Sequence, residues 1–345
     1  MKKSLIALAV LAASGVASAQ SSVTLYGLVD AYVGSVKSGG VTQVGVNLPA
    51  AAGGGGLNTS RFGFKGSEDL GGGLKANFLL EAGFDPSTGV ANNYTNPYTG
   101  ATSTATFGRQ SWVGLSGGFG EVKLGKMWTP FDEVKGSGAA AFDANIFAPA
   151  TFVWLSNTYQ DRPGNAIYYS TPSFGGLTAA AMYSFGENKT AAASAGKIAA
   201  VNVAYAGGPL AVAVSYQTEK ANGTVEAAKF LQVNASYDLG VVKVLGAYGR
   251  VKDLIPTIEK TNEYQLGLDF PITSTFTLSG GYAWSKDDSV FGGADTKRKG
   301  LGIAGLYALS KRTNLYAGVN DSKLEIPGAA DEKTRVIAVG VRHTF

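Results

Sequence analysis

The sequence predicts an all-β fold, a transmembrane antiparallel β-barrel of about 16 strands. Three observations predict it: apolar and polar residues alternate along many short segments, short turns alternate with long polar segments, and glycine and aromatic residues are abundant. The chain of 345 residues has 48 glycines, and 11% of its residues are aromatic. It has no cysteine, so its stability cannot come from disulfide bonds.

The first 19 residues have the features of a secretory signal peptide. Met1-Lys2-Lys3 is positively charged, an apolar run extends from Leu5 to Ala17, and Ala17-Ser18-Ala19 is a typical Ala-x-Ala cleavage site. The apolar run is too short for a transmembrane helix, which needs about 20 residues. We therefore expect residues 1–19 to be removed during export through the general secretory pathway and residues 20–345 to form the barrel.

A period of two residues marks the strands. In the segments 210–217, 231–238, 263–270 and 275–284, apolar side chains alternate with polar or small ones. Successive side chains of a strand point to opposite faces of the sheet, so each of these strands has one apolar face. A soluble β-sandwich produces the same alternation, with the apolar face turned inward. The connections between the strands distinguish the two architectures.

Short turns and long polar segments follow one another along the chain. The turns are predicted at Asp69–Gly73, Gly117–Gly120, Phe174–Gly176, Gly207–Pro209, Leu239–Gly240, Pro271–Ser274 and Ser310–Thr313. The long segments are predicted at residues 37–59, 86–105, 130–164, 187–196, 220–227, 253–261, 286–297 and 323–333. This alternation, with both termini on the turn side, is typical of outer-membrane barrels, which have an even number of strands. Nothing in the packing of a sandwich requires it.

The last residues predict a closing strand. Ile337, Val339, Val341, His343 and Phe345 share one face. A terminal aromatic residue on that face would lie in the aromatic girdle at the membrane boundary.

Several segments spread over the chain carry a family resemblance. They are Val23–Gly27, Ser60–Gly66 with Glu68–Gly71, Gly108–Leu115 with Gly118–Gly120, Asn165–Pro172 and Arg342–Phe345. In this order they resemble the trimeric porins of Gram-negative bacteria, in the form found in β-proteobacteria. The resemblance implies a homotrimer of sixteen-stranded barrels in the outer membrane, with a third external loop folded into the pore and a basic wall facing acidic residues of that loop. It also implies contacts with outer-membrane lipid and lipopolysaccharide, and an assembly signal at Phe345 that is read by the barrel-assembly machinery.

The segment from Trp128 to Asn165 is the longest one without clear alternation, and it is the third long loop. Its acidic residues are Asp132, Glu133, Asp143 and Asp161. Between them lie the apolar residues Phe142, Ile146, Phe147, Phe152, Val153 and Trp154. A freely solvated loop would expose these side chains to water. A structureless loop of this length is usually functional. We expect it to pack on the inner barrel wall, and the alternative is a mobile surface loop.

Side-chain parity predicts which basic residues face the lumen. Phe62 and Phe64 are assigned outward, which places Arg61 and Lys65 inward. The outward apolar residues of 74–80 likewise place Lys75, Asn77 and Glu81 inward. Trp112 is assigned outward, which leaves Arg109 inward.

The resemblance matches Arg61, Arg109 and Lys126 to the basic wall of the family's constriction. Parity leaves two positions open for Lys126, the lumen and the contact between subunits, and Arg162 before the sixth strand is a further basic candidate. At one position where relatives often carry a basic residue, this chain has Tyr168. The predicted constriction consists of Arg61, Lys75, Arg109, Lys126, Asp132, Glu133, Asp143 and Arg162.

These features predict passive diffusion of small hydrophilic solutes and ions. Opposed basic and acidic residues create a transverse field across a narrow, wet gap, which favours polar and charged solutes over apolar ones. We expect a weak preference for anions. Two alternatives share the architecture: a channel specific for one solute, such as an anionic nutrient, and a structural or adhesive barrel.

Other functions are disfavoured by composition. The only histidine is His343, and without cysteine there is no Cys-His chemistry, so we expect no enzyme, although a barrel lipase is conceivable. No His or Cys spacing predicts a metal site, and we expect no cofactor. The formal net charge of +4 is too small for a nucleic-acid binder.

Overall fold

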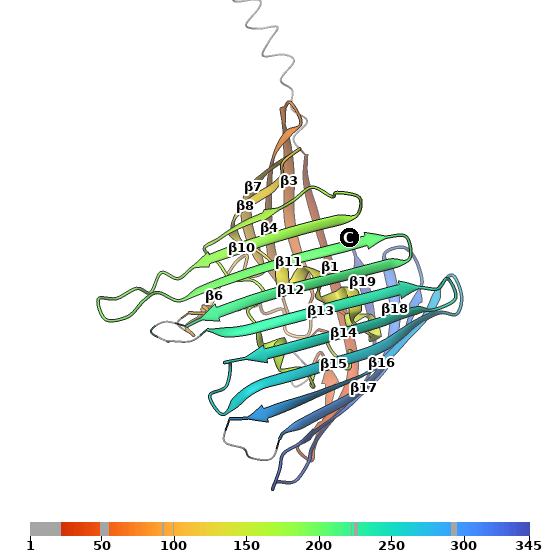
Figure 1. Ribbon diagram of the computed structural model, residues 1–345. Coiled ribbons are helices and arrows are strands. Elements are labelled where there is room, and N and C mark those ends of the chain that lie inside the picture. The colour runs from red at the N-terminus through yellow and green to blue at the C-terminus, as the bar shows by residue number, and fades with distance from the viewer. Residues whose placement is uncertain are drawn as a thin grey trace, which may run out of the picture.

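The structure is a computed structural model (Figure 1) that describes residues 22–48, 55–91, 93–98, 100–221, 223, 227–290 and 295–345. The predicted signal peptide at residues 1–19 lies outside the described residues. In the described part of the chain, no helix has the length and apolar character needed to cross a membrane.

The strands form a closed antiparallel barrel whose described residues occupy 16 strand positions. In chain order they are β1 (Ser22–Ser38), β2 (Val41–Val46), β3 (Arg61–Gly71), β4 (Leu74–Gly83), β7 (Gln110–Gly117), β8 (Gly120–Lys126), β9 (Ala166–Ser170), β10 (Leu177–Phe185), β11 (Lys197–Gly207), β12 (Leu210–Lys220), β13 (Ala228–Asp238), β14 (Lys243–Lys252), β15 (Ile258–Pro271), β16 (Phe276–Ser289), β17 (Lys297–Ala308), β18 (Thr313–Glu325) and β19 (Glu332–Thr344). The short β2 and the longer β3 share one position, because both pair with β1. The predicted sixteen-stranded barrel is confirmed.

The first and last strands close the barrel (Figure 1). They pair from Leu28↔Thr344 to Ser38↔Thr334. Beyond this register, the amide of Phe345 donates to the carbonyl oxygen of Gly27 at 3.0 Å. Among the described residues, each barrel strand from β3 to β19 pairs on both sides, and β1 pairs with β19 on one side and with β2 and β3 on the other. The sheet therefore closes on itself, as a bilayer requires.

The two faces of the wall differ as the alternation predicts. Leu266 and Val339 on the outer face are 60% and 58% exposed, whereas Gln265 and Asn320 on the inner face are 2% and 0% exposed. A β-sandwich would bury the apolar face. The outward apolar face fits a lipid environment, and the polar inner face fits a lumen.

The connections also follow the predicted order. Each of the seven predicted short turns joins two successive strands at one end of the barrel, and the long segments connect strands at the other. The second long segment contains a small hairpin of β5 (Asn93–Thr95) and β6 (Thr102–Thr104). The third contains α2 (Pro130–Lys135) and three single turns, η1 (Gly136–Gly138), η2 (Ala141–Asp143) and η3 (Leu155–Thr158).

One parity assignment is wrong. On β7 the outer face carries Val113 and Leu115, which are 58% and 45% exposed. Trp112 therefore points inward, where it packs against a buried cluster that includes Met127 and Tyr168. An apolar cluster inside the barrel makes the two faces of this strand alike in composition, which parity reasoning cannot resolve.

Candidate pore constriction

The third long segment contacts inward-facing side chains of several barrel strands. Its first part is α2, whose N-terminus is capped by Thr129, with Pro130 in the first turn. Phe131 is 1% exposed and packs edge-on against Tyr159 and Phe230, with ring centroids 4.8 and 6.2 Å away. Asn202 of β11 donates to the carbonyl oxygen of Pro130 at 2.7 Å. The helix is thus attached to the wall by both apolar and polar contacts.

The second part of the segment runs over β15 to β18. Inward-facing polar side chains of the wall bind its backbone: Ser279 Oγ accepts from the amide of Ala141 at 2.8 Å, and Asn320 donates to the carbonyl oxygen of Ala148 at 2.8 Å. Ile146 and Phe147 are fully buried in a cluster with Tyr316.

Asp143 lies in a strained turn of this segment. Ala141, Phe142 and Asp143 have φ values of 52°, 63° and 47°, in the left-handed region that non-glycine residues rarely adopt. The surrounding contacts hold this turn against its conformational cost. The Asp143 side chain is among those that line a cavity.

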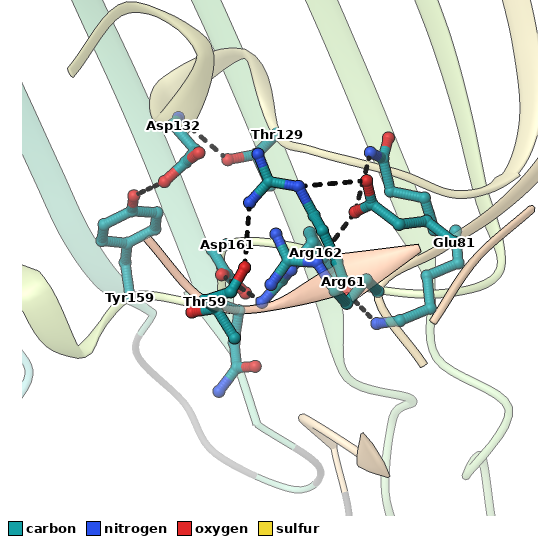
Figure 2. Close-up of polar contacts among 12 residues, drawn as sticks. Thr59, Arg61, Glu81, Thr129, Asp132, Tyr159, Asp161 and Arg162 are labelled. Carbon is teal, nitrogen blue, oxygen red and sulfur yellow. Dashed lines mark hydrogen bonds and ion pairs between the residues drawn. The ribbon is translucent and has the colours of Figure 1, made fainter. Parts of the chain in front are cut away.

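This cavity is where the wall and the loop face each other (Figure 2). It has a volume of about 480 Å³. Arg61 and Arg109 of the wall line it, together with the charged loop residues Asp132, Lys135, Asp143, Asp161 and Arg162. Five of the eight residues that the sequence assigns to the constriction are thus brought together.

Glu81 of β4 organises the wall arginines. Its Oε1 accepts from Nε of Arg109 at 2.8 Å, and its Oε2 lies 3.5 Å from Nε of Arg61. The hydroxyl of Tyr26 donates to the same carboxylate at 2.9 Å. Charge-assisted hydrogen bonds of this kind fix side-chain geometry, so the two guanidinium groups are held at defined positions on the wall.

Trp128 connects the wall to the loop. The guanidinium carbon of Arg162 lies 4.2 Å from the centre of the Trp128 ring, and that of Arg109 lies 5.5 Å from it. Arg162 also forms an ion pair with Asp161 at 2.9 Å. Stacking over an indole ring stabilises a guanidinium without neutralising its charge.

The other three predicted residues lie outside the cavity lining. Lys75 is exposed beside the β3–β4 turn, six residues from Glu81 and so about 20 Å away along the strand. The ammonium of Lys126 donates to the carbonyl oxygen of Arg162, beside the cavity. Glu133 accepts from the hydroxyl of Tyr168 at 2.9 Å.

Burial changes the ionisation of the loop acids. It raises the pKa of Asp132 to about 6, against smaller lowering effects from Lys135 and from the hydroxyl of Tyr159, which donates to this carboxylate. Burial likewise raises the pKa of Asp143, with Lys135 acting in the opposite direction. The acidic side of the cavity therefore loses its charge more readily than free aspartates do.

Sequence reasoning missed part of this site. It placed Glu81 in the lumen but not beside the arginines, and it gave no role to Trp128, Asn58 or Thr59, which also line the cavity. The alternation of side chains along β4 was enough to predict that Glu81 faces the lumen. Its pairing with Arg109 depends on the register between β4 and β7, which the sequence does not display.

The chain was compared with known proteins. A model described as Gram-negative porin matches residues 5–325. The chain is 36% identical to outer membrane porin protein 32 of Delftia acidovorans and 32% identical to an outer membrane porin protein of Bordetella pertussis, each over the full length of both chains. Its fold is similar to a solved anion-selective porin from Comamonas acidovorans, with a TM-score of 0.74, 31% identity, and coverage of 94% of this chain and 100% of that one.

Proposed function

The chain belongs to the Gram-negative porin family, and we propose that its outer-membrane pore passes small anions in preference to cations. Membership in this family makes it a channel for passive diffusion and not an enzyme. The relative from Comamonas acidovorans is described as anion-selective, which favours the same sign for this chain.

The three arginines that line the cavity carry this proposal. Arg61, Arg109 and Arg162 are permanently charged and held in place by Glu81 and Trp128. The opposing Asp132 and Asp143 have raised pKa values. The positive side of the field is therefore fixed, whereas the negative side weakens as protons bind. Charges in a narrow passage are poorly screened, so this imbalance acts on each passing ion.

We further propose that residues 127–165 narrow the lumen at this cavity. Their contacts with the inner face of β11 and β15 to β18 support this position. Solutes would then pass between Arg61 and Asp143. Lys126 and Glu133 would shape the field from beside the passage.

The assembled state is also a proposal. A homotrimer follows from the family, and contacts with outer-membrane lipid, lipopolysaccharide and the barrel-assembly machinery follow from its location. Cleavage after Ala19 would give a mature chain that starts at Gln20, which N-terminal sequencing of the outer-membrane protein would test.

The test of selectivity is a reversal-potential series across a salt gradient in planar bilayers. We expect Arg61→Ser and Arg109→Ser to lower the anion-to-cation permeability ratio by about sixfold to thirtyfold, because one charge ~8 Å away contributes about 0.5–1 kcal/mol at an effective dielectric constant of about 40–80 and acts with opposite sign on the two ions. Asp143→Asn should raise the ratio. Arg335→Ser is the matched control, since Arg335 is exposed and pairs with Asp321 instead of lining the cavity. If no variant at Arg61, Arg109 or Asp143 changes the ratio, these residues do not set selectivity.

A further inference from the structure

A short segment between β2 and β3 is buried inside the barrel, although it belongs to the first long connection. In residues 55–60, Leu57 and Ser60 are each 2% exposed. Asn58 and Thr59 line the cavity that contains the three arginines. A connecting segment this deeply buried must satisfy its backbone polar groups through protein contacts.

The segment is attached to the inner wall through Asp30 of β1, which is itself fully buried. Asp30 Oδ2 accepts from the amide of Asn58 at 2.8 Å, and the hydroxyl of Ser60 donates to the carbonyl oxygen of Asp30 at 3.1 Å. Arg342 of β19 donates to Asn58 Oδ1 at 2.6 Å. The amide of Asp30 also donates to Ser60 Oγ at 2.9 Å, so four hydrogen bonds connect this segment to the two strands that close the barrel.

Gly56 permits this close approach. A Cβ atom at this position would lie 1.8 Å from the hydroxyl oxygen of Tyr316 and 2.6 Å from Asp30 Oδ1. The hydroxyl of Tyr316 itself donates to Asp30. Any side chain at Gly56 would therefore push the segment away from its attachment.

The other side of the segment holds the third long loop. The amide of Asn145 donates to the carbonyl oxygen of Leu57 at 3.3 Å, and Asn145 Nδ2 donates to Thr59 Oγ1 at 3.3 Å. The Leu57 side chain belongs to the same buried cluster as Ile146 and Phe147. Both backbone and side-chain contacts therefore join residues 55–60 to residues 145–147.

The same segment also leads directly into the arginine wall. Arg61 follows Ser60, and its Nη1 donates to the carbonyl oxygen of Thr59 at 3.3 Å. One short stretch of chain is thus bonded to a wall arginine on one side and to the loop that carries Asp143 on the other.

We propose that residues 55–60 are the positioning element of the constriction, with Leu57 as its central residue: they fix the separation between Arg61 and the third loop. This inference rests on the proposal that residues 127–165 narrow the pore. It adds that the loop holds its position through a second, buried loop segment and not through the barrel wall alone. Without that segment, the part of the third loop around residues 145–147 (the loop tip) would move, and the width of the pore would fluctuate.

The first test is truncation of Leu57, read by single-channel recording in planar bilayers. Leu57→Ala is expected to increase the population of displaced loop tips about tenfold or more, because removing a buried leucine side chain costs more than the ~1.4 kcal/mol that a tenfold change requires. The displaced tip should appear as open-channel noise and subconductance steps. Leu57→Met should restore quiet currents.

The matched control is Leu28→Ala, at a leucine of β1 that is 6% exposed and lies outside the cluster around Phe147. We expect this variant to lower the heat stability of the barrel without adding current noise. If Leu57→Ala behaves like Leu28→Ala, the role of Leu57 is packing alone, and the proposal is overturned.

The second test cross-links the contact, which is feasible because the chain has no cysteine of its own. In the double variant Thr59→Cys/Asn145→Cys, we expect a disulfide to form in the folded barrel and the oxidised channel to be quiet, with noise appearing on reduction. Failure to form the disulfide, or currents that are identical before and after reduction, would contradict the proposal.

The two proposals fail in distinguishable ways. Current noise in the cysteine variant reports the position of the loop whatever the sign of ion selectivity, whereas the arginine series reports the sign. A noisy reduced channel together with an unchanged permeability ratio in Arg61→Ser would uphold the positioning role and reject the charge assignment.

Discussion

At the scale of single residues, the lumen combines buried charge with specific partners. Glu81 accepts from Tyr26 and contacts two arginines, so neither its own charge nor theirs is isolated in the wall. Isolated charges are costly to bury, and removing one member of a buried pair is usually more damaging than replacing the pair. Trp128 contributes by stacking over the guanidinium of Arg162, which also pairs with Asp161.

The pKa of Asp132 predicts that selectivity depends on pH. Burial raises this pKa to about 6, and the charged or titratable groups that influence it are Lys135, Tyr159, Asp161 and Asp143. As the pH falls from about 7 to about 5, Asp132 becomes neutral, so the anion-to-cation permeability ratio should rise. Because the folded-state pKa lies above the unfolded value, protonation of Asp132 stabilises the barrel in this window, and unfolding does not explain the change.

Reversal potentials measured over this pH range would check the prediction. Asp132→Asn should raise the ratio at about pH 7 and flatten its pH dependence. A wild-type ratio that is the same at both ends of the range would contradict the assignment of Asp132 to the passage.

At the scale of elements, the strands were predictable and their lateral partners were not. The period of two residues and the alternation of turns with loops specify where strands lie, because the face of a strand toward lipid is apolar and the face toward the lumen is polar. Arg61 was found by the same parity, since Phe62 and Phe64 beside it are outward and 38% exposed. Parity failed at Trp112, where an apolar cluster inside the lumen removes the contrast between faces.

Contacts between loops were beyond the reach of the sequence for a different reason. The bond between Asn145 and Thr59 joins residues that are far apart in the chain and lie in no regular element. No periodicity marks such a pair. The buried position of Leu57 follows only once β1, β18 and the third loop have been placed together.

The packing of the third loop on β17 predicts the effect of a small substitution. A Cβ atom at Gly302 would lie 1.9 Å from the carbonyl oxygen of Phe147 and 2.9 Å from the amide nitrogen of Pro149. Both neighbours are backbone atoms, so the loop itself must move away from the wall. We expect Gly302→Ala to lower single-channel conductance and to destabilise the barrel by about 1–3 kcal/mol.

Gly246→Ala is the control, because its Cβ would meet Leu266 and the carbonyl oxygen of Gln265 at ordinary distances of 3.7 and 3.9 Å. Single-channel conductance and resistance to heat in detergent would measure both variants. Equal behaviour of Gly302→Ala and Gly246→Ala would show that the loop does not depend on contact with β17.

At the scale of the whole molecule, barrel closure joins the two ends of the chain. Residues 22–28 pair with β3, and the following residues of β1 pair with β19, so the last strand completes a sheet that begins with the first. Contacts of such sequence separation form late, because the loop-closure entropy of the chain opposes them. The terminal residues are therefore the ones on which completion of the barrel depends.

Phe345 is the residue at which this dependence can be tested. Its backbone exchanges two hydrogen bonds with Gly27, at 3.0 and 3.1 Å, and its ring is 45% exposed on the outer face. Replacing it by serine removes apolar surface worth about 1.5–3 kcal/mol from the closing strand. We expect Phe345→Ser to reduce the amount of folded, heat-modifiable protein in outer-membrane fractions while the exported precursor is still processed, and Phe345→Trp to retain it.

Phe119→Ser is the matched control, since Phe119 is 46% exposed in the β7–β8 turn and takes no part in closure. Because both serine variants remove the same surface, a loss confined to Phe345→Ser would assign the effect to the closing position. Equal yields of the two would mean that closure does not need the terminal aromatic ring.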